Sequence, residues 1–304
     1  MIKVKVPATS ANMGPGFDCF GIALNLYNVV SACEIDGGLE IMSSDLTVCR
    51  SEERNRKNLV YRAMCEVFSK AEYEPKGIKI IHGKSEIPRT RGLGSSAACA
   101  VAGVLLANEI AGHPFTRREL LNMAVKIEGH CDNATPAMYG GFGASFIKNG
   151  VTYFDTVPVM DSIRFVLFVP HFTVSTQKSR KSLPHSVPLG DAVNNISHAA
   201  MMGMAFASGN FKGLPLLFSD AIHEKHRKSS IPNADFLIKA SSKFGAYGTY
   251  VSGSGPTLAA VVSEKRLTNY LNLMRNFVEE NHIKCDIIPA HVENHGALID
   301  KKEK

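Results

Sequence analysis

The sequence predicts a two-domain α+β protein. Segments typical of strands and of helices follow one another in mixed order, which favours α+β layers packed side by side. The chain has 304 residues, of which 45% are hydrophobic and 20% charged, and this is enough for two cores in a globular protein. Three glycine-rich loops lie at the start, at one third and at five sixths of its length. We expect the boundary between residues 150 and 162, dividing the chain into domains 1–155 and 156–304.

In the first half, four segments share β-branched side chains and boundaries at Gly or Asp, so strands are predicted at residues 2–6, 29–35, 39–42 and 77–82. Residues 58–70 place apolar side chains at helical spacing, and a second helix should span residues 96–111. Thr116 and Glu119 have the spacing of a capping box. This predicts a third helix that continues to about Glu128.

The second half opens with a predicted buried strand at residues 163–170, which are mostly apolar. Helices are then expected at residues 191–207, 214–225 and 233–244. A strand at 258–262, a helix and a last strand at 286–291 complete the expected order. The three methionines at positions 201, 202 and 204 favour core packing, because methionine commonly fills gaps in cores.

The middle glycine-rich loop, residues 88–98, is typical of a phosphate-binding loop because it leads directly into a helix of small residues. Gly92 and Gly94 permit backbone angles that other residues avoid and can bring N–H groups close to an anion. Ser95 and Ser96 add hydroxyl groups, and the positive end of the helix dipole faces the loop. No lysine follows the last glycine, so the loop is not a Walker A motif. Taken alone, it could also be an ordinary entrance to a helix.

Two further glycine-rich loops favour the phosphate-binding interpretation. Residues 7–21 follow the first predicted strand and carry Gly14, Gly16 and an acid, Asp18, that looks buried among apolar neighbours. Residues 251–257 read Val-Ser-Gly-Ser-Gly-Pro-Thr and lie between a predicted helix and an apolar strand. Three such loops in this order resemble the signature motifs of the GHMP kinases, a family that includes galactokinases, homoserine kinases and mevalonate kinases. The resemblance spans nearly the whole chain.

The resemblance implies the GHMP kinase two-domain fold, with an ATP-binding N-terminal domain similar to domain 2 of ribosomal protein S5 and a ferredoxin-like C-terminal domain. It implies an ATP-dependent small-molecule kinase with Mg²⁺ as cofactor. Ser96 and Glu128 would hold the metal, although the sequence does not separate Ser96 from Ser95, and a Glu at a helix end can also be a solvated surface residue. Asn58 would contact adenine, or it could be a plain N-cap. The implied ATP site comprises Asn58, Pro88, Arg89, Thr90, Arg91, Gly92, Leu93, Gly94, Ser95, Ser96, Ala97 and Ala98, with Gly253, Ser254 and Gly255 from the third loop.

Charged residues indicate the acceptor. The segments around Arg180, Arg227 and residues 128–136 are most similar to the homoserine kinase branch, which implies that L-homoserine is phosphorylated at its hydroxyl in threonine biosynthesis. By resemblance, Asp18 receives the substrate ammonium and the two arginines bind its carboxylate, a task that suits their planar donors. Asp18 could instead cap a turn, and either arginine could be a solvated surface residue. The implied substrate site is completed by Asn12, His130 and Asn133, of which His130 could also be structural.

Asn133 bears on the mechanism, because it stands where the mevalonate kinase and galactokinase relatives carry a catalytic aspartate. An amide cannot accept a proton in the useful range, so this position cannot be a general base. We therefore expect Asn133 to orient the acceptor hydroxyl while Ser96, Glu128 and the metal stabilise charge, with no dedicated base. Asp132 is the alternative base if local geometry turns it inward, but in an extended segment it would point away from its neighbours.

Composition argues against several other functions. The net charge of +6 comes without a dense basic stripe, which argues against nucleic-acid binding and is compatible with an anionic nucleotide. No apolar run approaches the ~20 residues of a membrane span, and we expect a cytoplasmic protein with no membrane partner. The resemblance implies a homodimer. The cysteines lack C-x-x-C spacing, which argues for a reducing compartment and against zinc or disulfides: Cys19, Cys33, Cys49, Cys65, Cys99, Cys131 and Cys285.

Two alternative functions stay open at this point. Another GHMP kinase of the mevalonate or sugar type should have a carboxylate at position 133. A non-catalytic ligand sensor with this fold could lose its metal ligands, whereas Glu128 and both serines are present.

Overall fold

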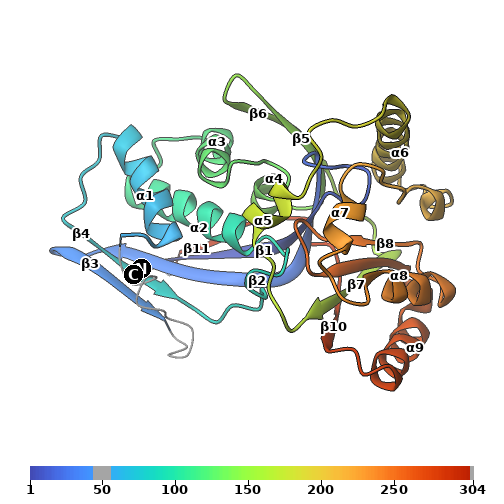
Figure 1. Ribbon diagram of the computed structural model, residues 1–304. Helices are drawn as coiled ribbons and strands as arrows, with labels where there is room; N and C mark the ends of the chain where they lie inside the picture. The colour runs from blue at the N-terminus through green and yellow to red at the C-terminus, as the bar shows by residue number, and fades with distance from the viewer. Residues whose placement is uncertain (44–55, 302–304) are drawn as a thin grey trace.

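A computed structural model of the protein describes residues 1–43 and 56–301. Within these residues, the first sheet has seven strands in the order β11-β1-β2-β4-β3, with the hairpin β5–β6 attached to β2 (Figure 1). Neighbouring strands are antiparallel except for β3 and β4. The strands are β1 (Ile2–Ala11), β2 (Phe20–Glu34), β3 (Gly38–Ser43), β4 (Gly77–His82), β5 (Phe142–Lys148), β6 (Val151–Val157) and β11 (Leu298–Lys301).

Four helices cover one face of this sheet (Figure 1). They are α1 (Leu59–Lys70), α2 (Ser95–Ile110), α3 (Arg117–Glu128) and α4 (Ala134–Tyr139). α2 is the central helix and packs against α1, α3, α4 and β1. It is apolar around its whole circumference, as expected for a helix surrounded by other elements. Gly103 lies where a Cβ atom would be 2.4 Å from the carbonyl oxygen of Val60, so glycine permits the close approach of α1 and α2.

A second sheet has four antiparallel strands in the order β10-β7-β9-β8. They are β7 (Ile163–Pro170), β8 (Gly248–Val251), β9 (Leu258–Ser263) and β10 (Cys285–Ala290), and α8 (Ala234–Lys243) and α9 (Leu267–Glu280) pack against them. Side chains alternate along β7. Phe165 and Leu167 enter the core shared with the first sheet, whereas Val166 and Phe168 enter the smaller core beneath α8 and α9.

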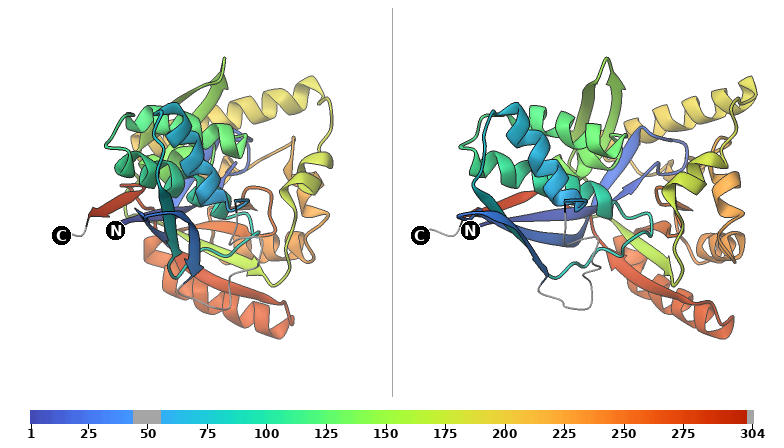
Figure 2. Two further views of the ribbon diagram at one scale, coloured as in Figure 1. Left: turned by 90° about the vertical axis from the view of Figure 1, so that its left-hand side faces the viewer. Right: turned by 60° about the vertical axis from the view of Figure 1, so that its left-hand side comes forward.

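The remaining helices connect the strands of the second sheet. Three follow β7: α5 (Thr176–Lys181), α6 (Leu189–Ser208) and α7 (Glu224–Lys228), with a short 3₁₀ helix at Leu214–Leu216. α6 extends along the outer edge of the molecule (Figure 2). No helix among the described residues is long and apolar enough to cross a membrane. None of the described cysteines forms a disulfide, and Cys49 lies outside the described residues.

The predicted α+β architecture is confirmed, and several predicted elements match closely. The strands at 77–82 and 163–170 have the predicted bounds, and α3 begins with the predicted capping box at Thr116 and Glu119. The division at residues 155 and 156 falls within β6 and stays a prediction. β11, near the end of the chain, pairs with β1, so the first sheet contains a strand from the predicted second domain.

Other predictions are wrong. The helix expected at 214–225 is broken, because the side chain of Asp220 accepts hydrogen bonds from the N–H groups of His223 and Glu224 and starts a new helix there. The third glycine-rich loop lies between two strands, β8 and β9, not after a helix. Met202 is buried as expected, but Met201 and Met204 are exposed. The hairpin β5–β6, the short helices α4 and α5, and the strands β8 and β11 were not predicted.

Candidate active site

The loop at the start of α2 has the geometry of an anion site. Gly94 precedes the helix with a φ of 67°, and no side chain caps the first N–H groups, so they are available to an anion. A Cβ atom on Gly94 would lie 1.9 Å from Thr9 Oγ1, and one on Gly92 would lie 2.2 Å from the carbonyl oxygen of Ser252. Both glycines therefore combine a left-handed backbone with a close contact that excludes any side chain.

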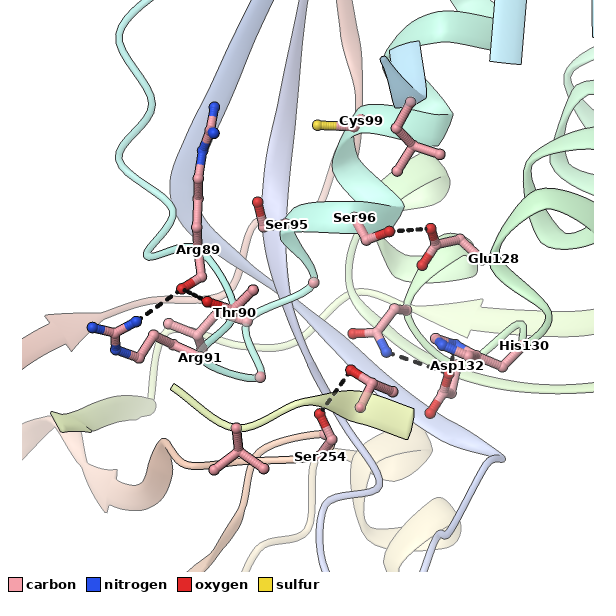
Figure 3. A pocket seen from close by; sticks show the side chains of 18 of the residues that line it. Arg89, Thr90, Arg91, Ser95, Ser96, Cys99, Glu128, His130, Asp132 and Ser254 are labelled. Carbon is pink, nitrogen blue, oxygen red and sulfur yellow. Dashed lines mark hydrogen bonds and ion pairs between the residues drawn. The ribbon is translucent and has the colours of Figure 1, made fainter. Parts of the chain in front are cut away.

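Thr90 holds an unusual conformation in this loop. Its φ of 53° is in the left-handed region, which a β-branched residue rarely adopts. Its hydroxyl donates to the carbonyl oxygen of Arg89 at 2.7 Å, and Arg91 Nη1 donates to the same oxygen at 3.0 Å (Figure 3). Arg91 Nε donates to the carbonyl oxygen of Pro170 at 2.7 Å, which ties the loop to the end of β7.

The structure distinguishes the two serines that the sequence could not separate. Ser96 Oγ donates to Glu128 Oε1 at 2.5 Å, whereas Ser95 lies on the other side of the helix start (Figure 3). Burial raises the pKa of Glu128, although the Ser96 hydrogen bond and the nearby His130 oppose this shift. Glu128 and Ser96 together offer two oxygen ligands next to the phosphate-binding loop. Oxygen is the ligand atom that Mg²⁺ prefers, so this pair fits the predicted metal.

His130, Asp132 and Asn133 face the same space from the turn before α4. His130 Nδ1 lies 2.8 Å from Asp132 Oδ1, and Asn133 Nδ2 donates to that oxygen at 3.4 Å. Burial disfavours the imidazolium, but the hydrogen bond and charge of Asp132, with the charge of Glu128, outweigh it and raise the pKa of His130. Local geometry turns Asp132 toward its neighbours, because residues 131–133 form a turn and not an extended segment, so Asp132 stays the alternative base.

Asn133 is fixed by a second contact. Its Oδ1 accepts a hydrogen bond from Thr9 Oγ1 at 2.8 Å, and this oxygen also lies near the place that a side chain on Gly94 would fill. With its oxygen engaged, the Asn133 amide presents its NH₂ group toward Asp132. Thr9, which the sequence analysis did not single out, therefore orients the amide.

The first glycine-rich loop supplies Asn12 and Asp18. Both have positive φ, at 71° and 53°. Asn12 is buried; its Oδ1 accepts from the N–H of Asp18 at 3.0 Å, and its Nδ2 donates to the carbonyl oxygen of Gly253 at 2.9 Å. The Asp18 side chain is not buried as the sequence suggested but 36% exposed. It accepts two hydrogen bonds from Arg180, from Nη1 and Nη2, each at 2.8 Å. These hydrogen bonds and the charge of Asp18 raise the pKa of Arg180.

Arg227 lies deeper in the site and is 3% exposed. Its Nη1 donates to the carbonyl oxygen of Gly253 at 2.5 Å and lies 3.4 Å from His223 Nδ1, while its buried Nε has no hydrogen-bond partner among the residues that the structure describes. His223 Nε2 lies 2.9 Å from the carbonyl oxygen of Gly14, which can only accept, so this nitrogen carries a proton. The ring of Phe17 stacks on His223 at 5.1 Å, and the Arg227 guanidinium lies 5.2 Å from the same ring.

The three glycine-rich loops contact one another directly. The N–H of Gly253 donates to the carbonyl oxygen of Ala11 at 3.1 Å. The N–H of Thr257 donates to the carbonyl oxygen of Arg91 at 3.3 Å. Ser252 Oγ donates to the carbonyl oxygen of Gly92 at 2.6 Å. The third loop therefore joins the first loop to the phosphate-binding loop.

A chain of hydroxyl groups leads to this contact between Ser252 and Gly92. Ser10 Oγ lies 2.8 Å from Ser252 Oγ and 2.8 Å from Tyr250 Oη. The single hydroxyl proton of Ser252 is donated to the carbonyl oxygen of Gly92, so Ser252 accepts from the Ser10 hydroxyl. Ser10 has then used its own proton, so it accepts from the Tyr250 hydroxyl. The chain runs in one direction, from the fully buried Tyr250 to the backbone of the phosphate-binding loop.

Most of the predicted site residues line one cavity of about 460 Å³. Of the predicted site residues, Pro88, Ala97, Ala98 and Gly255 do not line it. The predicted residues that do are Asn12, Asp18, Asn58, Arg89, Thr90, Arg91, Gly92, Leu93, Gly94, Ser95, Ser96, Glu128, His130, Asn133, Arg180, Arg227, Gly253 and Ser254, together with Asp132.

Several lining residues were missed. Lys57, His82 and Cys99 border the part of the cavity nearest Asn58, and Val174 and Thr176 border it from the start of α5. Asn58 caps α1 through the N–H of Tyr61 at 3.1 Å, as its alternative interpretation predicted, and its Nδ2 lies 3.0 Å from His82 Nε2. The position of Lys57, directly before Asn58, and of Cys99, one turn after Ser95, could have identified these two from sequence.

No group of three or more His, Cys, Asp and Glu side chains within residues 1–43 and 56–301 is placed to hold a metal ion. A metal in this cavity would therefore need ligands from elsewhere. Phosphate oxygens of a nucleotide would supply them beside Ser96 and Glu128.

Comparison with known proteins identifies the family. The GHMP kinases N terminal domain matches residues 58–141, and the GHMP kinases C terminal domain matches residues 204–276. The chain belongs to the GHMP kinase family. It is accordingly an ATP-dependent small-molecule kinase, and the predicted fold, family and enzyme class are confirmed.

Relatives within the family agree with this assignment. The chain is 42% identical over 299 residues to homoserine kinase of Clostridium beijerinckii, with 98% of each covered, and 41% identical to homoserine kinase of Caldicellulosiruptor saccharolyticus, covering 98% of this chain and 96% of the relative. The crystal structure of homoserine kinase from Cytophaga hutchinsonii is 27% identical with a TM-score of 0.86, covering 98% and 97%. A mevalonate kinase from L. major, 17% identical with a TM-score of 0.70 over 96% of both chains, shares the fold.

Proposed function

We propose that this GHMP kinase transfers the γ-phosphoryl group of ATP to the terminal hydroxyl of L-homoserine and forms O-phospho-L-homoserine for threonine biosynthesis. The observation that carries the proposal is the set of charges beside the phosphate-binding loop. One carboxylate, Asp18, and two guanidinium groups, Arg180 and Arg227, line the same cavity as Gly92 and Gly94. An amino acid with a side-chain hydroxyl needs this combination, and the curated relatives carry the name homoserine kinase.

In the nucleotide half of the site, backbone N–H groups of residues 92–96 would bind the phosphates, and Asn58 would lie at the adenine end. Pro88, Ala97, Ala98 and Gly255 would support the loops without contacting ATP, since they do not line the cavity. Ser96 and Glu128 would hold Mg²⁺, whose chemistry is to neutralise the charge of the transferring phosphoryl group.

In the acceptor half, Asp18 would bind the ammonium and Arg180 and Arg227 the carboxylate of homoserine. The unpaired, buried Nε of Arg227 supports this role, because a buried donor without a partner is expensive unless a ligand satisfies it. His130 would contact the amino acid. Asn12 would act indirectly, because its Oδ1 accepts a hydrogen bond from the backbone N–H of Asp18 and so holds Asp18 in place.

We propose transfer without a dedicated general base. Asn133, oriented by Thr9, would position the acceptor hydroxyl, and its amide cannot take the proton. Asp132 faces the cavity, but its carboxylate already accepts hydrogen bonds from His130 and Asn133. Asp132→Asn should therefore keep substantial turnover. A folded but inactive Asp132→Asn enzyme, with a loss of about 10² to 10⁴ in kcat, would identify Asp132 as the base.

The direct experiment is product identification. The purified protein is incubated with MgATP and L-homoserine, ADP release is followed, and the phosphate ester is identified by ³¹P NMR. The proposal predicts stoichiometric ADP and O-phospho-L-homoserine. ADP release that does not depend on homoserine would contradict it. A sugar- or mevalonate-type substrate is not favoured, because Asn133 lacks the carboxylate that those relatives use.

The finer organisation of the protein also belongs to this proposal. Residues 1–155 would form the ATP-binding domain and residues 156–304 the C-terminal domain. The lack of a disulfide among the described cysteines is compatible with a cytoplasmic location. A homodimer would use α6, which lies at the edge of the molecule (Figure 2). Five large apolar side chains of this helix are exposed: Leu189, Val193, Ile196, Met201 and Met204. Light scattering of the wild type and of Ile196→Asp tests this, since the variant should be monomeric.

A further inference from the structure

The acceptor half contains an ion pair of its own. Asp18 and Arg180, which the proposed function assigns to opposite ends of the amino acid, bind each other through two parallel hydrogen bonds of 2.8 Å. Their side chains are 36% and 38% exposed, and both line the cavity. Two of the three charges that the substrate would use are therefore already neutralised by each other.

The two partners are held differently. Asp18 lies in the left-handed region with its N–H bound to Asn12, and Asn12 is in turn bound to Gly253, so the first and third loops fix the carboxylate. Arg180 is carried by α5, a helix of six residues in which Ser179 is the buried member. Its guanidinium lies 6.0 Å from the ring of Phe17.

Arg227 offers a contrast within the same cavity. Among residues 1–43 and 56–301, no carboxylate lies within ion-pair distance of its guanidinium, and its Nε is unpaired. The acceptor half thus holds one internal ion pair and a second cation, Arg227, which the charge of Asp18 reaches without forming an ion pair. A ligand that supplies only a carboxylate can reach Arg227, but it must compete with Asp18 for Arg180.

We propose that the Asp18–Arg180 pair selects zwitterionic alcohols by exchanging its internal partner for both charges of the ligand. This inference rests on the proposed function. A zwitterion gives Asp18 an ammonium and Arg180 a carboxylate, so the exchange leaves neither charge unpaired. A ligand with one charge either leaves the internal pair in place and loses a contact, or breaks the pair and leaves one member without a partner.

Two analogues of homoserine test the exchange. 4-Hydroxybutyrate lacks the ammonium and 3-aminopropan-1-ol lacks the carboxylate. Isothermal titration of the full-length protein measures the affinity of each analogue and of homoserine. Asp18→Asn releases Arg180 and should raise the affinity for 4-hydroxybutyrate about 3- to 5-fold, the factor that a partly exposed ion pair is worth. Arg180→Gln releases Asp18 and should raise the affinity for 3-aminopropan-1-ol by a similar factor, while both variants lose affinity for homoserine.

The matched control is Asp161→Asn, which makes the same change of charge. Asp161 is 91% exposed and lies 3.4 Å from Arg164, away from the cavity residues. It should leave all three affinities unchanged. Asp18→Ser replaces Asp18→Asn if the amide variant does not fold, as judged by circular dichroism.

A loss of affinity for all three ligands in Asp18→Asn, or an unchanged affinity for 4-hydroxybutyrate, overturns the exchange. Either outcome with a wild type that phosphorylates homoserine leaves the proposed function intact. A wild type that does not turn over homoserine but turns over another acceptor contradicts the proposed function itself.

Discussion

The two halves of the cavity, which the proposed function assigns to the nucleotide and to the acceptor, are built in different ways. In the nucleotide half, residues 92–96 are consecutive, and backbone groups held by Thr9 and Ser252 create the site. In the acceptor half, Asp18, Arg180 and Arg227 come from three distant segments, and side-chain charges create the site. Rigid backbone suits phosphates, which are common to every kinase of the family. Side chains suit the acceptor, which varies. Substitutions in the two halves should therefore change different kinetic parameters.

The largest expected effect is in the nucleotide half. Glu128→Gln should lower kcat by about 10² or more, because a charge that stabilises the transition state is lost. The homoserine dissociation constant should stay within about twofold, since Glu128 lies apart from the acceptor charges. Turnover at saturating magnesium and homoserine titration measure the two effects. Glu66→Gln on α1, which removes a partly exposed carboxylate paired with Lys70 and Lys126, is the control. Unchanged turnover would remove Glu128 from the site.

Whereas Glu128→Gln should mainly change kcat, Arg227→Gln should mainly change KM for homoserine. It removes a buried cation from the acceptor half, so KM for homoserine should rise about 10²-fold, the scale of a lost charge-assisted hydrogen-bond pair. KM for ATP should change less than about twofold if the two halves act separately. Steady-state kinetics with each substrate varied gives both values. A comparable rise in both KM values would mean that Arg227 acts by holding Gly253 and the loops.

The sequence predicted the nucleotide half better than the acceptor half for the same physical reason. Glycines that need positive φ, and a helix start after them, leave a local pattern in residues 92–96. The pairing of Asp18 with Arg180 depends on tertiary structure and leaves no local pattern. Asp18 and the arginines were found only through similarity to related segments, and their binding to each other was not foreseen.

The elements of the fold also divide into those with a local sequence signal and those that depend on distant parts of the chain. The strands at 77–82 and 163–170 were predictable because apolar β-branched runs are local signals. The hairpin β5–β6 was missed even though Asn149 and Gly150 form a recognisable turn signal between its strands. β11 could not be predicted, because its partner β1 lies at the other end of the chain.

A smaller effect is expected where the halves join. Tyr250→Phe removes the first donor of the hydroxyl chain that ends on Gly92, so KM for ATP should rise about 3- to 5-fold, in keeping with about 1 kcal/mol for one hydrogen bond. The control is Tyr270→Phe, which removes a buried tyrosine hydroxyl bound to Ser241 in the smaller core. It should lower stability comparably and leave KM for ATP unchanged. Equal KM values in both variants would rule out the chain as a support for the loop.

The smallest effect concerns stability. Glu224 is buried beside Arg227, and burial raises its pKa to about 7, above the ordinary value of 4.5 for a glutamate. Folded protein therefore binds more protons than unfolded protein between these values, and the charged carboxylate costs stability above pH 7. Glu224→Gln keeps an acceptor for the N–H of Val251 and should stabilise the protein at pH 8 by about 1 to 3 kcal/mol, a gain that disappears by pH 5.

Urea unfolding of both proteins at each pH measures this difference. Comparing variant with wild type cancels the contribution of His223, whose pKa burial lowers to about 4 and whose effect on stability has the opposite sign. A difference that does not depend on pH would show that Glu224 titrates normally.

Together, the two halves of the cavity would make this protein a kinase for homoserine. The most direct test of this function is to measure kcat/KM with MgATP for homoserine, mevalonate, galactose, shikimate and threonine in parallel. Homoserine should exceed mevalonate, galactose and shikimate by at least about 10², because a site that pairs both charges of an amino acid rejects ligands that leave a charge unpaired. It should also exceed threonine, which has both charges but carries a secondary hydroxyl one carbon closer to them. A higher kcat/KM for mevalonate or galactose than for homoserine would contradict this function.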